Sequence, residues 1–379
     1  MTPPVVKAAD AAQFLALVPR MVGFLPRRSV VLVPFSRGRS LGAMRVDLPP
    51  DDVDPDGVAA TVLGMVCRVE SADAVAVVVY TDTAWPDGRM PHRAFVDGLA
   101  RRARDCGLAV TDLLCVAPAG WGSYLAGRPG GPRALAEITA PEAGLPPQPT
   151  GDQHVGARLQ SAAPAEKEQV ARALTALRCA IDLVCGPGTD AASDAADASA
   201  PRVDPTALTA MCALDDVPAL FEDALGWDAA ALSPFDAALM VWTLARPSLR
   251  DIALVQWCGD AEDGEAALDA QLRWEAGEEY PPGLAMRMWG EGGVPDHDRL
   301  RRALEIARRA AAVAPRGQRP GALATCAWLS WALGRSTHAE QYAQRACEIE
   351  PEHGLAEIVR SFVQAGHLPD WAFRAAGSR

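Results

Sequence analysis

The sequence predicts an α/β domain of three layers followed by an all-helical domain, and two observations carry this prediction. Between residues 29 and 116, short β-branched apolar runs alternate with longer stretches of helical spacing, a pattern typical of a sheet covered by helices. Beyond Asp204 only helical patterns are found. A chain of 379 residues is long enough for two domains that each have a core.

The predicted sheet begins with two strands joined by a tight turn. Residues 29–35 form a short apolar run that predicts a buried strand. Residues 41–48 alternate, with Arg45 and Asp47 on one side of an extended chain and Val46 on the other. Because residues 36–40 between them contain a glycine and have the length of a hairpin connection, we expect the two strands to pair antiparallel. A helix over residues 8–18 precedes them.

Two further strands alternate with two helices. Residues 53–69 have helical spacing, and residues 74–80 are apolar on both faces, as expected of a parallel strand covered by helices. A helix over residues 91–106 and a strand over residues 108–116 follow. The order strand, helix, strand, helix, strand predicts right-handed crossovers within a three-layer domain.

Composition predicts the remaining loops and domain boundaries. Glycine and proline dominate residues 118–151, which predicts loops around a short helix at 132–138. An amphipathic helix over residues 166–184 leads to residues 187–203, where the lack of large apolar side chains predicts a disordered linker or loop. The predicted organisation is an α/β domain over 1–150, a connecting helix within 151–186, the linker over 187–203 and an all-α domain over 204–379.

Helical-hairpin repeats are predicted for the all-α domain. Five tryptophans are 15, 15, 17 and 15 residues apart: Trp227, Trp242, Trp257, Trp274 and Trp289. This spacing fits one helix and one turn per tryptophan, and it equally fits chance spacing in an irregular bundle. Near the end, Ala339, Ala346 and Pro351 match the second-helix spacing of tetratricopeptide-like repeats, with Gly334 at the turn. Such hairpins commonly form protein-binding surfaces.

Several segments resemble a single family. They include Gly23-Phe24, Pro26, Ser29-Val-Val-Leu-Val33, Arg45-Val-Asp-Leu-Pro49, Leu249-Arg250-Asp251 and the run from Ala327 to Gly334. Together they are similar to an actinobacterial family catalogued as domain of unknown function 4192, a resemblance that implies no activity. Members of that family often have a Trp-x-Ser-Tyr segment followed by a cysteine-rich turn. This chain keeps Trp121-Gly-Ser-Tyr124 without the cysteines, so the resemblance implies no metal or redox role here.

The distribution of charge, cysteine and apolar residues disfavours several classes of protein. Residues 1–150 carry 15 basic and 15 acidic side chains, so the net charge of −12 belongs to the rest of the chain and disfavours nucleic-acid binding there. The nine cysteines are scattered without a Cys-x-x-Cys pair, so we expect neither a disulfide framework nor a zinc site. No signal peptide is recognised, and no apolar run approaches the roughly 18 residues needed to span a bilayer. We predict a cytoplasmic protein with no membrane partner.

Two carboxylates follow strands of the predicted sheet. Asp47 comes after the second strand and Asp82 after the strand over residues 74–80. Ligands of α/β sheets bind beyond the carboxyl ends of strands, and paired acids can hold Mg²⁺ through water and substrate oxygens. An antiparallel second strand, however, can place Asp47 at the opposite end of the sheet from Asp82. Arg45 offers Asp47 an ion pair on the same face, and Asp82 suits a helix or turn cap.

Basic and aromatic side chains suggest a second set of ligand contacts. Residues 11–46 contain no acidic residue and six arginines: Arg20, Arg27, Arg28, Arg37, Arg39 and Arg45. They could hold phosphates or the acidic second half of the chain, or simply be solvated. Trp121 and Tyr124, which lie among glycines, could stack on a planar ligand or attach their loop to the core.

Common catalytic motifs are absent. The sequence has no phosphate-binding P-loop, dinucleotide-binding glycine pattern, nucleophile elbow or His-Glu-x-x-His pattern, and no cofactor is indicated. We therefore favour a non-enzymatic protein that binds a protein partner through its C-terminal helices.

The alternative is a small-ligand or phosphate-binding enzyme with a site at the sheet edge. The first hypothesis predicts an exposed apolar groove on the helices, and the second predicts polar groups that converge over the sheet.

Overall fold

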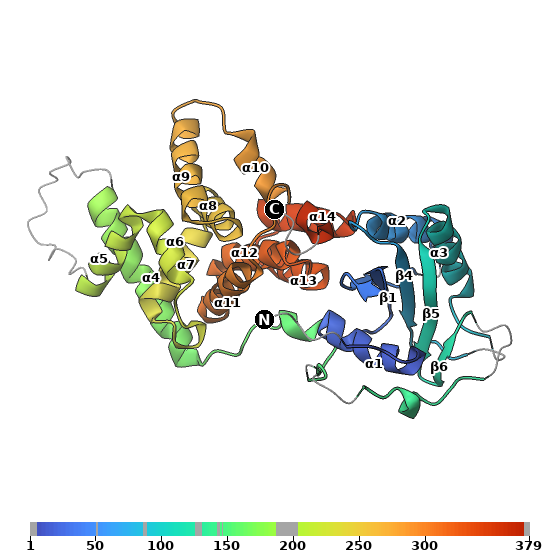
Figure 1. Ribbon diagram of the computed structural model, residues 1–379. Helices are drawn as coiled ribbons and strands as arrows, with labels where there is room; N and C mark the ends of the chain where they lie inside the picture. The colour runs from blue at the N-terminus through green and yellow to red at the C-terminus, as the bar shows by residue number, and fades with distance from the viewer. Residues whose placement is uncertain are drawn as a thin grey trace, which may run out of the picture. The chain divides into compact units, whose positions relative to one another are not determined.

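The computed structural model describes most of the chain as two compact units (Figure 1). The first unit runs to Val155 and includes Phe373, and the second covers Gly156–Ala372. The described residues are 6–50, 52–85, 89–125, 131–141, 145, 147–186 and 204–374. The predicted linker at 187–203 lies outside them.

The first unit is built on one mixed sheet. Its strands are β1 (Ser29–Ser36), β2 (Arg39–Ser40), β3 (Met44–Asp47), β4 (Ala74–Tyr80), β5 (Ala109–Ala117) and β6 (Gly120–Ser123). The strand order is β2-β1-β4-β5-β6, and β3 also pairs with β1. The predicted hairpin is confirmed, because both β2 and β3 lie antiparallel to β1. Arg37 and Gly38 form its turn with φ of 49° and 76°, the left-handed values that tight hairpin turns require.

The first strand runs opposite to the strands that the crossover helices connect. β1 pairs antiparallel with β4, and among the strands that the structure describes β4 and β5 form the one parallel pair. The reason is that β3, rather than β1, precedes the helix that leads to β4. Since β3 and β4 are each antiparallel to β1, they run in the same direction on either side of it.

Helices cover both faces of this sheet, so the three layers predicted from the sequence are confirmed. On one face α1 (Ala11–Val22) packs against Val31, Val33 and Val78, and on the other α2 (Pro55–Cys67) and α3 (Arg93–Asp105) pack against Val30, Val75 and Val77 (Figure 1). All seven residues of β4 are buried, as its apolar sequence predicts. The Asp54 side chain caps α2, which has proline in its first turn.

The glycine-rich segment after β5 is more regular than the sequence predicts. Gly120–Ser123 forms β6, antiparallel to β5, although these residues were expected to be a loop. Gly120 has φ of 142°, and a Cβ there would lie 2.2 Å from the Arg133 carbonyl oxygen. Glycine is required at this position because the backbone of the following segment comes so close. The expected helix at 132–138 is a single 3₁₀ turn, Leu135–Glu137.

The second unit is helical in the part of the chain that the structure describes. Its helices are α4 (Pro164–Cys185), α5 (Pro205–Cys212), α6 (Val217–Ala224), α7 (Pro234–Leu244), α8 (Pro247–Cys258), α9 (Ala261–Glu275), α10 (Pro282–Met288), α11 (His297–Val313), α12 (Pro320–Ala332), α13 (Ser336–Cys347) and α14 (Gly354–Gln364). Many have proline in the first turn, where its missing N–H has no helical partner to lose. α4 packs on α5 and α7 and contributes Val170, Leu174 and Leu177 to the core of this unit.

The last helices form a packed hairpin and a third helix. α12 packs on α13, and α13 packs on α14. Gly334, with φ of 72°, lies in the turn between α12 and α13, and Ala339 and Ala346 are buried. Whether this hairpin is of the tetratricopeptide type stays a prediction. The evenly spaced tryptophans do not share one core, because Trp257 is buried whereas Trp274 and Trp289 are about half exposed.

Candidate functional site

Asp47 and Asp82 lie at the same end of the sheet. Ser29, the first residue of β1, pairs with Asp47 on one side and with Tyr80 on the other, and Asp82 follows two residues after Tyr80. The sequence alone leaves this open, because it does not give the direction of the first strand relative to the strand over residues 74–80. The antiparallel pairing of β1 with β4 brings the two carboxylates to the same end.

Polar side chains from four separate segments line one pocket at this sheet end. Its volume is about 790 Å³. The segments are the entry to β1, the exit of β3, the loop after β4 up to the start of α3, and the loop at residues 152–154. The lining residues are Arg27, Arg28, Asp47, Leu48, Pro49, Pro50, Thr81, Asp82, Thr83, His92, Asp152, Gln153 and His154. We call this the sheet-edge pocket.

Arg45 does not line the sheet-edge pocket but contacts residues that position its lining. Its side chain is only 8% exposed, and it forms the predicted ion pair with Asp47, whose side chain is 79% exposed. Arg45 Nε also donates to Ser29 Oγ at 2.7 Å, and Ser29 Oγ donates to the Arg27 carbonyl at 2.6 Å. This chain of hydrogen bonds fixes the backbone just before β1, where the pocket arginines are located.

Arg27 and Arg28 present two charged side chains to the sheet-edge pocket. Both are exposed, and neither guanidinium forms an ion pair with a residue that the structure describes. The Arg27 backbone is held from both sides by the buried Gln153, whose Oε1 accepts from Arg27 N at 3.2 Å and whose Nε2 donates to Arg27 O at 3.1 Å. These side chains remain available to an anion.

The lining from the loop after β4 and the start of α3 includes Thr81, Asp82 and His92. Thr81 Oγ1 and His92 Nε2 are 3.0 Å apart, and Thr81 Oγ1 accepts from Thr83 N at 3.1 Å. The Thr81 hydroxyl therefore links the His92 ring to the backbone of the loop after β4. Asp82 is exposed, and its carboxylate caps no helix or turn within the described residues.

Left-handed backbone conformations recur around the sheet-edge pocket. Four non-glycine residues of the described chain have positive φ, and two of them, Arg28 at 45° and His92 at 56°, line this pocket. Such conformations cost roughly 1–3 kcal/mol each and persist where the surrounding structure imposes them, often at binding sites.

Trp121 and Tyr124 lie in the core, away from the sheet-edge pocket. Trp121 is 1% exposed and packs with the α1 face, whereas Tyr124 is 3% exposed and packs with the α2 and α3 face. The Arg133 guanidinium lies 4.1 Å from the centre of the Trp121 ring, and Tyr124 donates to the Pro91 carbonyl at 2.6 Å. These two aromatics attach their segment to the core, which was one of the two roles predicted.

The sequence did not indicate the contribution of Asp152, Gln153 and His154. They follow a glycine- and proline-rich stretch and lie more than 100 residues after β1. The hydrogen bond from Leu25 N to Gly151 O, 2.8 Å long, and the parallel bridge between Leu25 and Asp152 bring this loop to the pocket. Only the tertiary structure reveals this pairing.

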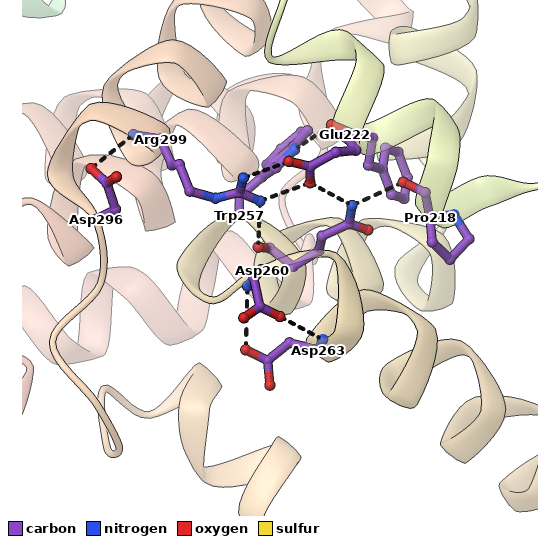
Figure 2. A network of polar contacts seen from close by, with 9 residues as sticks. Pro218, Glu222, Trp257, Asp260, Asp263, Asp296 and Arg299 are labelled. Atoms are coloured by element: carbon purple, nitrogen blue, oxygen red, sulfur yellow. Dashed lines mark hydrogen bonds and ion pairs between the residues drawn. The ribbon is translucent and has the colours of Figure 1, made fainter.

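A second polar cluster, in the helical unit, is paired within itself. Arg299 of α11 forms two hydrogen bonds with Glu222 of α6, at 2.6 and 2.8 Å, and donates to Gln256 O at 3.2 Å (Figure 2). Gln256 Nε2 donates to Glu222 and to Pro218 O. The hydrogen bond from Arg299 is the main cause that holds the pKa of Glu222 below its ordinary value. Glu222 neutralises Arg299, so this cluster joins helices and offers no free charge to a ligand. Within the described residues, Arg299 Nε and Gln256 Oε1 have no hydrogen-bond partner.

Two features are absent from the residues that the structure describes. Among them, no three His, Cys, Asp or Glu side chains are grouped so that they could hold a metal ion. None of their helices has the length and apolar character needed to cross a membrane.

Comparison with known proteins gives a family and no activity. Residues 12–290 match the model of the family described as domain of unknown function (DUF4192). The match covers most of the chain, so the protein belongs to this family. No curated protein and no solved structure matches it.

Proposed function

We propose that this member of the DUF4192 family binds a small anionic ligand in the sheet-edge pocket. The observation that carries the proposal is the convergence of Arg27, Arg28 and Asp82 from separate segments on one pocket of about 790 Å³. Polar groups that converge over the sheet are the feature that the ligand-binding hypothesis predicts. A pocket of this size suits a small molecule.

The charges in the pocket indicate the class of ligand. Arg45 neutralises Asp47, so the remaining charges of the lining are Arg27 and Arg28 against Asp82 and Asp152. The two guanidinium groups, which have no ion-pair partner among the described residues, suit a phosphate or carboxylate, which arginine binds in a bidentate manner. Asp82 and the Thr83 hydroxyl, which also lines the pocket, suit hydroxyl groups elsewhere on the same ligand. A sugar phosphate or a hydroxy acid has both kinds of group. We propose binding without assigning a reaction.

Thermal stability of the full chain tests the proposal. Inorganic phosphate, sugar phosphates, nucleotides and hydroxy acids are added singly, and an upward shift of the unfolding temperature marks a ligand. A ligand at about 100 times its Kd stabilises by about 2.7 kcal/mol, a shift of roughly 5 to 10 °C for a unit of this size.

The control variants come from the same arginine-rich segment. Arg27→Gln with Arg28→Gln removes both pocket guanidiniums, whereas Arg37→Gln with Arg39→Gln removes two exposed arginines that do not line the pocket. We expect the first pair to abolish the shift and the second pair to keep it. No shift with any anion, or a shift that survives in the first pair, rejects the proposal.

Protein binding through the C-terminal helices and a cytoplasmic location remain proposals drawn from the sequence. Trp274, on α9, is 55% exposed, and half-exposed tryptophans are typical of protein interfaces. Chemical cross-linking of the intact chain in cells, compared with Trp274→Leu, tests this role. A partner that is cross-linked equally by both forms argues against α9 as the binding surface.

A further inference from the structure

A second cavity lies within the helical unit and is separate from the sheet-edge pocket. Its volume is about 530 Å³. The start of α8, the end of α10, the start of α12 and the turn from α13 into α14 surround it. Its lining includes apolar and charged side chains, among them Trp289, Ile358, Phe362, Arg250, Asp251, Glu350, Glu352 and His353. We call it the helical pocket.

One wall of the helical pocket is apolar and open to solvent. Trp289 is 51% exposed and Ile358 is 43% exposed. The Trp289 ring lies 5.2 Å from the Phe362 ring, which in turn lies 4.7 Å from Trp331 in the buried core. The core aromatics therefore hold the Trp289 ring in place, while much of its surface remains available to a ligand.

The charged groups leave the helical pocket negative. Arg250, at 8% side-chain exposure, is neutralised by Asp251, to which its Nε and Nη2 both donate at 2.9 Å. Burial raises the pKa of Asp251, and the charge of Arg250 opposes that rise. Glu350 and Glu352 are exposed at the rim, and no described residue forms an ion pair or hydrogen bond with either carboxylate. Two negative charges thus remain uncompensated beside an aromatic surface.

His353 adds a buried hydrogen-bond donor to the same pocket. It is 7% exposed, and its Nδ1 accepts from the Ala356 N–H at 3.4 Å. Burial lowers the pKa of His353, so the ring is neutral near pH 7 and carries its proton on Nε2. Within the described residues Nε2 has no acceptor, which leaves this N–H for an atom of a ligand.

We propose that the helical pocket binds a small organic cation, such as an alkylguanidinium or alkylammonium. Its charge is attracted by Glu350 and Glu352 and by the face of Trp289, and its carbon chain covers Trp289 and Ile358. A carbonyl or hydroxyl oxygen of the ligand would accept from His353 Nε2. The volume lies within the range of small-molecule sites. This proposal is independent of anion binding in the sheet-edge pocket.

Four probes that share a butyl chain test the charge requirement on the full chain at low ionic strength. Butylguanidinium and butylammonium are cationic, butylurea is a neutral analogue of the guanidinium in shape, and pentanoate is anionic. Ligand-observed NMR titration gives the Kd of each. We expect the cations to bind at least about tenfold more tightly than butylurea, because two carboxylates and an aromatic face favour the charge, and pentanoate not to bind.

Matched variants locate the binding. We expect Glu350→Gln with Glu352→Gln to weaken cation binding about fivefold to tenfold, and Trp289→Leu to weaken it about threefold. Glu348→Gln with Glu357→Gln changes the net charge equally, and Trp274→Leu removes another half-exposed tryptophan. None of these three residues lines the pocket, so Kd should stay within about twofold in both controls. Equal binding of butylurea, no binding of either cation, or equal losses in the control variants would overturn the proposal.

Discussion

Arg299 and Glu222 form a two-point ion pair that joins α11 to α6. The Nη1–Oε1 and Nη2–Oε2 distances are 2.6 and 2.8 Å, and Figure 2 shows the two side chains pointing toward each other. Arg299 Nη2 also donates to the backbone of α8 at Gln256. Three helices that are distant in sequence are therefore held by one guanidinium.

Glu222→Gln should destabilise the helical unit by about 1–2 kcal/mol, between the value of an exposed pair and that of a buried pair. The Glu222 side chain is 37% exposed, so solvent screens part of the interaction. Urea unfolding measures the change. The control is Glu168→Gln, which removes an exposed pair with Arg172 within α4 and should cost no more than about 0.5 kcal/mol.

The same pair should make stability depend on pH in the acidic range. The pKa of Glu222 is lowered in the folded state, so its stabilisation is complete above the unfolded pKa of about 4.3 and is lost as pH falls through the folded pKa. The stability difference between the wild type and Glu222→Gln should therefore shrink below about pH 4.3. A difference that stays constant from pH 7 to pH 3 would contradict this account.

Two buried tyrosines should respond oppositely to removal of the hydroxyl. Tyr124 donates to the Pro91 carbonyl at 2.6 Å, whereas the buried Tyr80 hydroxyl has no partner among the described residues. Tyr124→Phe should cost about 1–2 kcal/mol. Tyr80→Phe should lie within about 0.5 kcal/mol of the wild type or be stabilising, because it removes an unsatisfied polar group. Chemical denaturation compares them, and similar losses in both variants would contradict the assignment.

Arg28→Gly should weaken ligand binding without lowering the stability of the fold. Arg28 has φ of 45° at the sheet-edge pocket, and Arg37 has φ of 49° in the β1–β2 turn outside it. Glycine adopts this conformation freely, so both Arg28→Gly and Arg37→Gly should be neutral or stabilise by up to about 1 kcal/mol. Only Arg28→Gly should weaken anion binding in a calorimetric titration. Equal affinities of the two variants would argue against Arg28 as a ligand contact.

Two helical glycines should tolerate alanine differently. A Cβ at Gly321 in α12 would lie 2.3 Å from the Leu244 carbonyl oxygen and 2.7 Å from Ala245 Cα, both backbone atoms. A Cβ at Gly64 in α2 meets nothing within 4 Å. Thermal unfolding should show a loss of about 1–3 kcal/mol for Gly321→Ala and a gain of about 0.5–1 kcal/mol for Gly64→Ala. A stabilised Gly321→Ala would show that α7 and α12 are not in such close contact.

Local signals predicted the helices and strands well where they were strong. The expected strand over residues 74–80 coincides with β4, because a run of β-branched valines favours a buried β-strand. The start of α2 was predictable from Asp54-Pro55, a cap followed by a first-turn proline. β6 was missed because Gly120 and Gly122 resemble loop residues, and only pairing with β5 makes them a strand.

The direction of β1 relative to β4, and the contacts between residues far apart in the chain, could not be predicted from the sequence. A buried strand such as β1 is apolar whether it lies parallel or antiparallel to its neighbour, so nothing local sets its direction relative to β4. Asp47 and Asp82 were predicted as site candidates, but their shared sheet end depends on that direction. The contribution of Gln153 depends on hydrogen bonds to Arg27 across 126 residues, for which no periodic pattern exists.

The short outer strands of the sheet bear on association between copies of the chain. At one edge lie β2 and β3, of two and four residues, and at the other lies β6, of four residues. The free side of β6 is already engaged, since Trp121 exchanges backbone hydrogen bonds with Arg133 at 2.8 and 2.9 Å. An approaching strand would find few unpaired backbone groups, with the exposed Arg39 and Asp47 beside them. The sheet is thereby protected from edge-to-edge aggregation, even though its central strands are among the most apolar segments of the chain.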